Sequence, residues 1–322
     1  MRESAVMNRP RWVLLVLVLL ALGSATLFLT LGARGGWGFV LAFRGGRLLA
    51  LATVAFAVAV STILFQTVTE NRILTPSVMG FDALFVLVQT ALVFALGQGA
   101  LVSLGPIPRF AVNVAVMTGF SLLLFRWLFL RETHSLHRLV LVGIVLGILF
   151  RSLSNFLQRI LDPNAFQVLQ DTLFASFSRA DVGLLGVSLV LIAAASLVLL
   201  RIGHRFDVLT LGRSHAISLG LDHHRTVMTI LLCVSVLVAV STALVGPVTF
   251  FGLLVASLAR ALVGDSRHRF VLPAAVLLAI VTLVGGQTIL ERVFRFDTAL
   301  SIIVEFLGGL VFLVLVLRGA AR

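Results

Sequence analysis

The sequence predicts an all-α, polytopic integral membrane protein, and its composition is the first reason. Of the 322 residues, 60% are hydrophobic and 12% are charged, whereas soluble domains have roughly 25% charged residues. All 25 basic residues are arginine, because the chain has no lysine. No low-complexity linker separates the apolar segments, so we expect one transmembrane domain over residues 1–322.

The second reason is the number of apolar segments that are long enough to cross a bilayer. Each should be helical, because lipid offers no partner to an unpaired backbone amide or carbonyl. The sequence predicts about ten transmembrane helices, at residues 12–31, 48–65, 81–104, 110–130, 138–157, 183–202, 227–245, 248–263, 270–290 and 298–317.

The arginines predict the orientation of these helices. With both termini in the cytoplasm, sixteen arginines lie inside and nine outside, which is the bias expected for membrane proteins. They occur singly between apolar runs, so they indicate contact with membrane lipid rather than with nucleic acid.

One short sequence occurs twice. Residues 58–62 and residues 238–242 both read Val-Ala-Val-Ser-Thr. They fall in predicted spans that cross in opposite directions, as an inverted internal repeat requires.

A polar passage between two apolar runs predicts a short surface helix. Gly212 and Gly220 suit its start and its stop, with Gly220 as a left-handed C-cap. Between them Ala216, Ile217 and Leu219 form a small apolar face. Such a helix either inserts into a groove of a soluble partner or rests on lipid headgroups as a connector.

Other motifs mainly exclude chemistry. A nucleotide-binding P-loop needs a lysine, so any ATP hydrolysis must come from a separate polypeptide, and no catalytic constellation indicates an enzyme. The adjacent His223 and His224 diverge and have no third ligand, so we expect no metal and no cofactor. Glu305, inside the last predicted span, faces either a cavity or a basic partner such as Arg292 or Arg295.

Several passages together resemble one family, the permease subunits of binding-protein-dependent ABC importers for ferric siderophores, haem and vitamin B12 (type II importers). Residues 211–220 resemble that family's cytoplasmic "LG…A..LG" element, and residues 246–253 its "GPIxFxGL" turn. Arg44-Gly45-Gly46-Arg47 keeps the spacing of its "R-x-P-R" motif but lacks the proline. Residues 70–80 look most like the branch that carries catecholate-type ferric siderophores.

The resemblance implies a bacterial cytoplasmic (inner) membrane location and a set of partners. These are two cytoplasmic ATP-binding subunits, a second permease, identical or paralogous, and an extracytoplasmic substrate-binding protein. It also implies site residues: an ATPase-coupling helix with Leu211, Gly212, Ala216, Leu219 and Gly220, and binding-protein docking by Arg44, Arg47 and Arg292. Between the two permeases we expect a path of small neutral side chains, with Glu305 as its candidate acid. An ion-coupled secondary transporter, and haem or vitamin B12 as cargo, are the alternatives.

Overall fold

The computed structural model describes residues 2–32, 36–103, 105–129, 136–173 and 182–292, with residues 306, 309, 310 and 313 beyond them. Within these residues the chain consists of helices joined by turns and short connections, and it has no strand. Seven helices are long and apolar enough to cross a membrane, and two shorter apolar helices are Phe81–Gly97 and Phe251–Val263. These nine match the first nine predicted spans; the tenth, 298–317, lies almost entirely outside the described residues.

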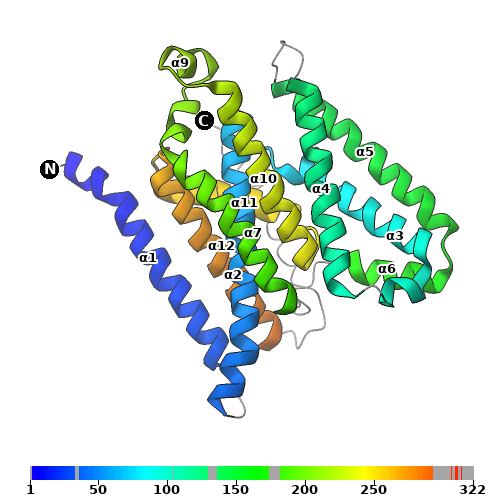
Figure 1. Ribbon diagram of the computed structural model, residues 1–322. Helices are drawn as coiled ribbons and strands as arrows, with labels where there is room; N and C mark the ends of the chain where they lie inside the picture. The colour runs from blue at the N-terminus through cyan, green and yellow to red at the C-terminus, as the bar shows by residue number, and fades with distance from the viewer. Residues whose placement is uncertain are drawn as a thin grey trace. The chain divides into compact units, whose positions relative to one another are not determined.

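The chain divides into two compact units, each described here by itself. In unit 1, the first helix packs along the last described one, and the short α11 contacts both of them. Figure 1 shows these helices in blue, orange and yellow. Unit 1 comprises α1 (Arg2–Thr30), most of α2 (Trp37–Val68), α11 (Phe251–Val263) and α12 (His268–Arg292).

Helix α2 begins at Trp37, well before the predicted start at residue 48. The predicted apolar run begins only after the two arginines of the Arg-Gly-Gly-Arg sequence, whereas the helix already includes them. Arginine is a good helix former, and Arg44 and Arg47 find partners inside unit 1. The Arg-Gly-Gly-Arg sequence is therefore part of a helix and not of the connection before it.

Unit 2 is organised around α3, which contacts α4, α5 and α6, while α10 packs against α4 (Figure 1). A break at Gly97, whose φ is 71°, interrupts α3. The long helices of this unit are α3 (Phe81–Ser103), α4 (Pro106–Phe129), α5 (Leu136–Ile160), α7 (Val182–Arg201) and α10 (His223–Val245), with the shorter α6 (Pro163–Leu173).

An aspartate followed by a proline is typical of the start of a helix, with the aspartate as the N-cap and the proline at the first helical position. Helix α6 begins with such a pair. The Asp162 carboxylate accepts a hydrogen bond of 2.8 Å from the Asn164 backbone N–H, and Pro163 is the first helical residue. Buried Ala165 and Leu169 of α6 pack with Val93 of α3. Side chains spaced by four residues therefore fix α6 against α3.

The two copies of the repeated sequence have the same local structure. In α2 the Ser61 hydroxyl donates to the Val58 carbonyl at 3.1 Å, and in α10 the Ser241 hydroxyl donates to the Val238 carbonyl at 3.0 Å. Both serines are buried. The inverted relation of the two segments stays a prediction.

A close approach of two backbones joins α5 to the start of α3. The 3₁₀ helix η1 (Pro76–Met79) ends at Gly80, which has a left-handed φ of 91°. A Cβ on Gly80 would lie 2.8 Å from the Gly147 Cα, and a Cβ on Gly143 would lie 3.0 Å from the Met79 Cε. The Gly143-x-x-x-Gly147 spacing in α5 thus provides the flat surface that this contact needs.

We expect Gly80→Ala to lower the thermal stability of the purified protein, because the new methyl group meets backbone and the left-handed φ strains it. Left-handed strain alone costs about 1–3 kcal/mol. The matched control is Gly186→Ala in α7, where no atom lies within 4 Å of the new Cβ. Thermal unfolding in detergent would contradict the close approach if Gly80→Ala were as stable as this control.

Candidate functional site

The polar passage after α7 folds into a capped helix of six residues, α9 (Arg213–Ser218). Gly212 precedes it with a φ of 87°, and Gly220 follows it with a φ of 83°. The Leu221 N–H donates to the Ala216 carbonyl at 3.0 Å, and the Gly220 N–H to the Ile217 carbonyl at 2.9 Å. This pair of bonds is a Schellman motif. The structure therefore confirms the predicted left-handed C-cap.

The burial of side chains in α9 corrects the predicted apolar face. Ala216 is fully buried, whereas the exposed fractions of Leu211, Ile217 and Leu219 are 55%, 50% and 65%. Ala216 therefore anchors the helix to its own chain. The apolar surface that is available to a partner consists of Leu211, Ile217 and Leu219.

Two neighbouring helices hold α9 in place. It contacts α8 (Phe206–Leu209), of which Phe206 and Leu209 are buried, and it contacts the start of α10. The Asp222 carboxylate caps α10 by accepting a 3.0 Å hydrogen bond from the Arg225 N–H. The adjacent His223 and His224, considered above for metal binding, therefore lie in the first turn of that helix.

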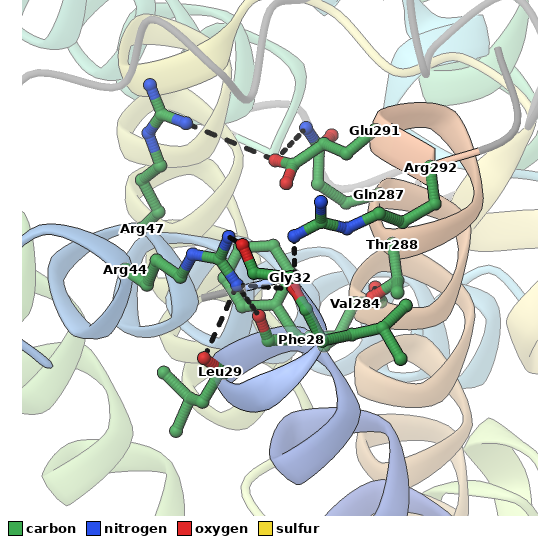
Figure 2. A network of polar contacts seen from close by, with 11 residues as sticks. Phe28, Leu29, Gly32, Arg44, Arg47, Val284, Gln287, Thr288, Glu291 and Arg292 are labelled. Atoms are coloured by element: carbon green, nitrogen blue, oxygen red, sulfur yellow. Dashed lines mark hydrogen bonds and ion pairs between the residues drawn. The ribbon is translucent and has the colours of Figure 1, made fainter. Parts of the chain in front are cut away.

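A second candidate site lies where α1 ends (Figure 2). The last carbonyl groups of a helix have no partner within that helix, and the last turn of α1 has no basic residue. The Arg44 guanidinium of α2 donates to four carbonyl oxygens at this helix end and in the turn after it, those of Phe28, Leu29, Leu31 and Gly32, at 3.0, 3.3, 2.9 and 3.3 Å. A cation is also favoured at this end by the helix dipole.

Arg292, the last residue of α12, donates to the Leu31 carbonyl at the same helix end. Arg47 has different partners. Its guanidinium is 4.0 Å from the Glu291 carboxylate and 4.4 Å from the centre of the Phe43 ring. The Glu291 carboxylate also accepts a 3.1 Å hydrogen bond from the buried Gln287 amide. We call Arg44, Arg47, Glu291 and Arg292 the arginine cluster.

The structure thus brings together all three arginines that the sequence assigned to docking. It also gives each an interaction within the chain that sequence reasoning did not include. Arg44 and Arg47 are half-buried, and Arg292 is exposed. Any partner that binds the cluster would share these guanidinium groups with the α1 carbonyls and with Glu291.

Glu305, the predicted pathway acid, lies outside the described residues. The structure shows another acid that sequence reasoning missed, Asp82 in the first turn of α3. Asp82 is 8% exposed and accepts a 2.9 Å hydrogen bond from the Thr249 hydroxyl, which ties the turn after α10 to the start of α3. An acidic residue at the start of an apolar run was the available signal.

Polar residues on α5 were also missed as a group. Arg151, Asn155 and Arg159 recur every four residues and are exposed. Arg151 is near the middle of the membrane-length segment Val140–Ile160. An arginine facing lipid at that depth costs about 2.5–3.5 kcal/mol on insertion scales.

In the described ranges, His, Cys, Asp and Glu form no group of three or more that could hold a metal.

Comparisons with known proteins identify the family. The FecCD transport family model matches residues 12–318. The chain is 43% identical over 284 residues to the petrobactin import system permease protein YclO of Bacillus subtilis (strain 168), covering 88% of this chain and 90% of that protein. It is 34% identical over 274 residues to the petrobactin import system permease protein FatC of Bacillus anthracis, covering 85% and 77%.

A solved structure supports the fold. A metal-chelate type ABC transporter in an inward-facing conformation matches with a TM-score of 0.83 at 23% identity, covering 96% of this chain and 99% of that one. The family model spans nearly the whole sequence and two relatives exceed 30% identity, so this chain belongs to the FecCD transport family.

Proposed function

We propose that this chain is the permease subunit of an ATP-driven, binding-protein-dependent importer that carries a ferric siderophore across a bacterial cytoplasmic membrane. The observation that carries the proposal is α9, a capped helix with Leu211, Ile217 and Leu219 exposed, in a chain without lysine that belongs to a transport family. Such a chain needs an ATPase from elsewhere and a surface on which to receive its motion. The petrobactin permease relatives support a siderophore as the cargo.

In this proposal α9 is the coupling helix. Leu211, Ile217 and Leu219 enter a groove of a cytoplasmic ATP-binding subunit, and buried Ala216 transfers the motion to α8 and α10. Gly212 and Gly220 keep the helix short, because both have the left-handed backbone that favours glycine.

The complete importer would contain two permeases, identical or paralogous, two ATP-binding subunits and an extracytoplasmic binding protein. Both termini of this chain would be cytoplasmic, as the arginine distribution favours. In that orientation the C-terminal end of α1 lies outside, since α1 crosses the membrane once from the N-terminus. The arginine cluster would then be available to acidic residues of the binding protein.

An ion-coupled secondary transporter remains the alternative of a different class. It would use intramembrane acids to bind the coupling ion, and Asp82 is the acid that the structure adds to Glu305. Its hydrogen bond from Thr249 suits a structural tie between α3 and the α10–α11 turn. Haem or vitamin B12 would be the alternative cargo within the same family.

The decisive experiment is uptake into proteoliposomes. The permease is reconstituted with and without its ATP-binding subunits, and ferric siderophore loaded on the binding protein is added outside. We expect uptake only when the ATP-binding subunits, ATP and the binding protein are all present. Uptake driven by an ion gradient without an ATPase would replace this proposal with the secondary transporter.

We expect Leu219→Glu to uncouple the importer while leaving the permease folded, because a charge enters the apolar contact from an exposed position. ATP hydrolysis stimulated by the loaded binding protein, and uptake, should both fall at least severalfold. Ala216→Glu should instead reduce the yield of folded protein, because that side chain is fully buried. Normal coupling in a Leu219→Glu, Ile217→Glu double variant would remove α9 from this role.

For the arginine cluster, we expect opposite effects from the two partners of one ion pair. Arg47→Glu should weaken the binding protein's affinity, and Glu291→Gln should strengthen it, because the neutral amide no longer competes for the guanidinium of Arg47. Each change should be about two- to fivefold, since an ion pair with the binding protein at the rim of the interface would contribute roughly 0–1 kcal/mol. Both effects should shrink at high salt. Titrations in which neither variant differs from wild type would leave the cluster with only its role at the end of α1.

A further inference from the structure

Arg151 stands in the part of α5 that should be the most apolar. The membrane-length segment Val140–Ile160 has 21 residues, so Arg151 is about 13 Å from its nearer end at ~1.5 Å per residue. Helix side chains lean toward the N-terminus of their helix. The Arg151 side chain therefore leans away from that nearer end, which makes it harder for the guanidinium to reach the membrane surface.

Helix α5 has three distinct faces. One is buried in unit 2 and contains Gly143, Gly147 and Ser154. The second is exposed and apolar, with Leu149, Leu153, Phe156 and Ile160. The third face is exposed, and it is polar in the C-terminal half of the helix. Its polar residues are Arg151, Ser152, Asn155 and Arg159. We call the third face the α5 polar stripe.

Three surroundings could meet the α5 polar stripe, and two of them fit poorly. Lipid suits the apolar face but not a mid-span arginine. A dry protein interface would bury two like charges. Across the described ranges, neither the Arg151 nor the Arg159 side chain has a hydrogen bond or an ion pair that would compensate for this burial. Water that contains an anion satisfies both guanidinium groups. Among the described spans, α5 is the one with an exposed arginine near its middle.

We propose that the α5 polar stripe lines the water-filled path between two permease copies and binds the anionic oxygens of the iron chelate as it passes. This rests on the proposed function and adds the residues that contact the cargo. Guanidinium groups form paired, charge-assisted hydrogen bonds with carboxylate and catecholate oxygens. The Asn155 amide adds an NH2 group that donates and a carbonyl oxygen that accepts, between the two arginines in sequence. The path thus differs from the neutral lining that the sequence suggested.

The stripe also predicts selectivity. Three catecholates leave ferric iron with a net negative charge, whereas three hydroxamates leave it neutral. Arginines at positions 151 and 159 attract the negatively charged tricatecholate complex, and they have no net charge to attract in the neutral trihydroxamate complex. The cargo class is therefore an anionic iron chelate.

The first test measures whether the side chain at position 151 is accessible to water, and it requires no chelate. Cys233 is the single cysteine and is buried, so Cys233→Ala gives a thiol-free background. Arg151→Cys in the assembled importer should react with water-soluble methanethiosulfonates, and faster with the anionic than with the cationic reagent because Arg159 remains. The matched control is Leu149→Cys on the apolar face, which should not react. A thiol at position 151 as inert as the one at position 149 would overturn the proposal.

The second test measures uptake of a ferric tricatecholate chelate loaded on the binding protein. Arg151→Gln should lower the rate roughly tenfold, as expected for lost hydrogen bonds to a charged group, while Arg151→Lys should retain most of it. The control Arg201→Gln removes an exposed arginine at the end of α7 and should transport normally.

The two tests separate this inference from the proposed function. If wild type takes up no ferric chelate, the proposed cargo is wrong, and thiol reactivity still decides whether position 151 lines an aqueous path. If wild type transports the tricatecholate and Arg151→Gln transports it equally well, the α5 polar stripe does not bind cargo.

Discussion

In the hydrocarbon core of a bilayer, a backbone N–H or C=O without a protein partner has no water with which to bond, and every helix end near that core must be satisfied by the chain. The end of α1 shows the consequence most directly. Its carbonyl groups take hydrogen bonds from Arg44 of α2 and Arg292 of α12. One helix end thereby fixes two other helices beside it, and the packing of α1 along α12 follows.

The use of arginine alone as the basic residue suits this task. A guanidinium group has five N–H donors in one plane, and it stays charged at any physiological pH. Arg44 contacts four carbonyl oxygens with one side chain, three of them from Nη1 and one from Nη2. The same residue type has a different setting at position 47, beside Glu291, and another at position 151, on an exposed helix face. Its surroundings decide its role.

Glycine supports the structure by a different physical route. At Gly80 the backbone needs a left-handed φ and a neighbour within contact distance at once, and only a residue without Cβ meets both conditions. At Gly220 the left-handed φ closes α9 without any close neighbour. The first glycine fixes how α3 and α5 approach. The second fixes where a helix ends, and so which of its side chains face outward.

The elements that depend on local pattern follow from the amino-acid sequence alone. Apolar length predicted nine described membrane segments, Asp162-Pro163 predicted the start of α6, and Gly220 predicted the C-cap of α9, because each depends on residues close in the chain. The motifs also identified the family. Glu305 and nearly all of the last predicted span lie outside the described residues, so they stay predictions.

The packing of the helices determines which side chains face inward and what the arginines contact. Ala216 and Leu219 are both apolar and three residues apart, yet one is buried and the other is 65% exposed. Arg44 lies 13 residues from Leu31 along the chain, and Arg292 lies 261 residues from it. The pairing of a charge with a helix end, or of Asp82 with Thr249, depends on which helices pack together, and no local pattern contains that information.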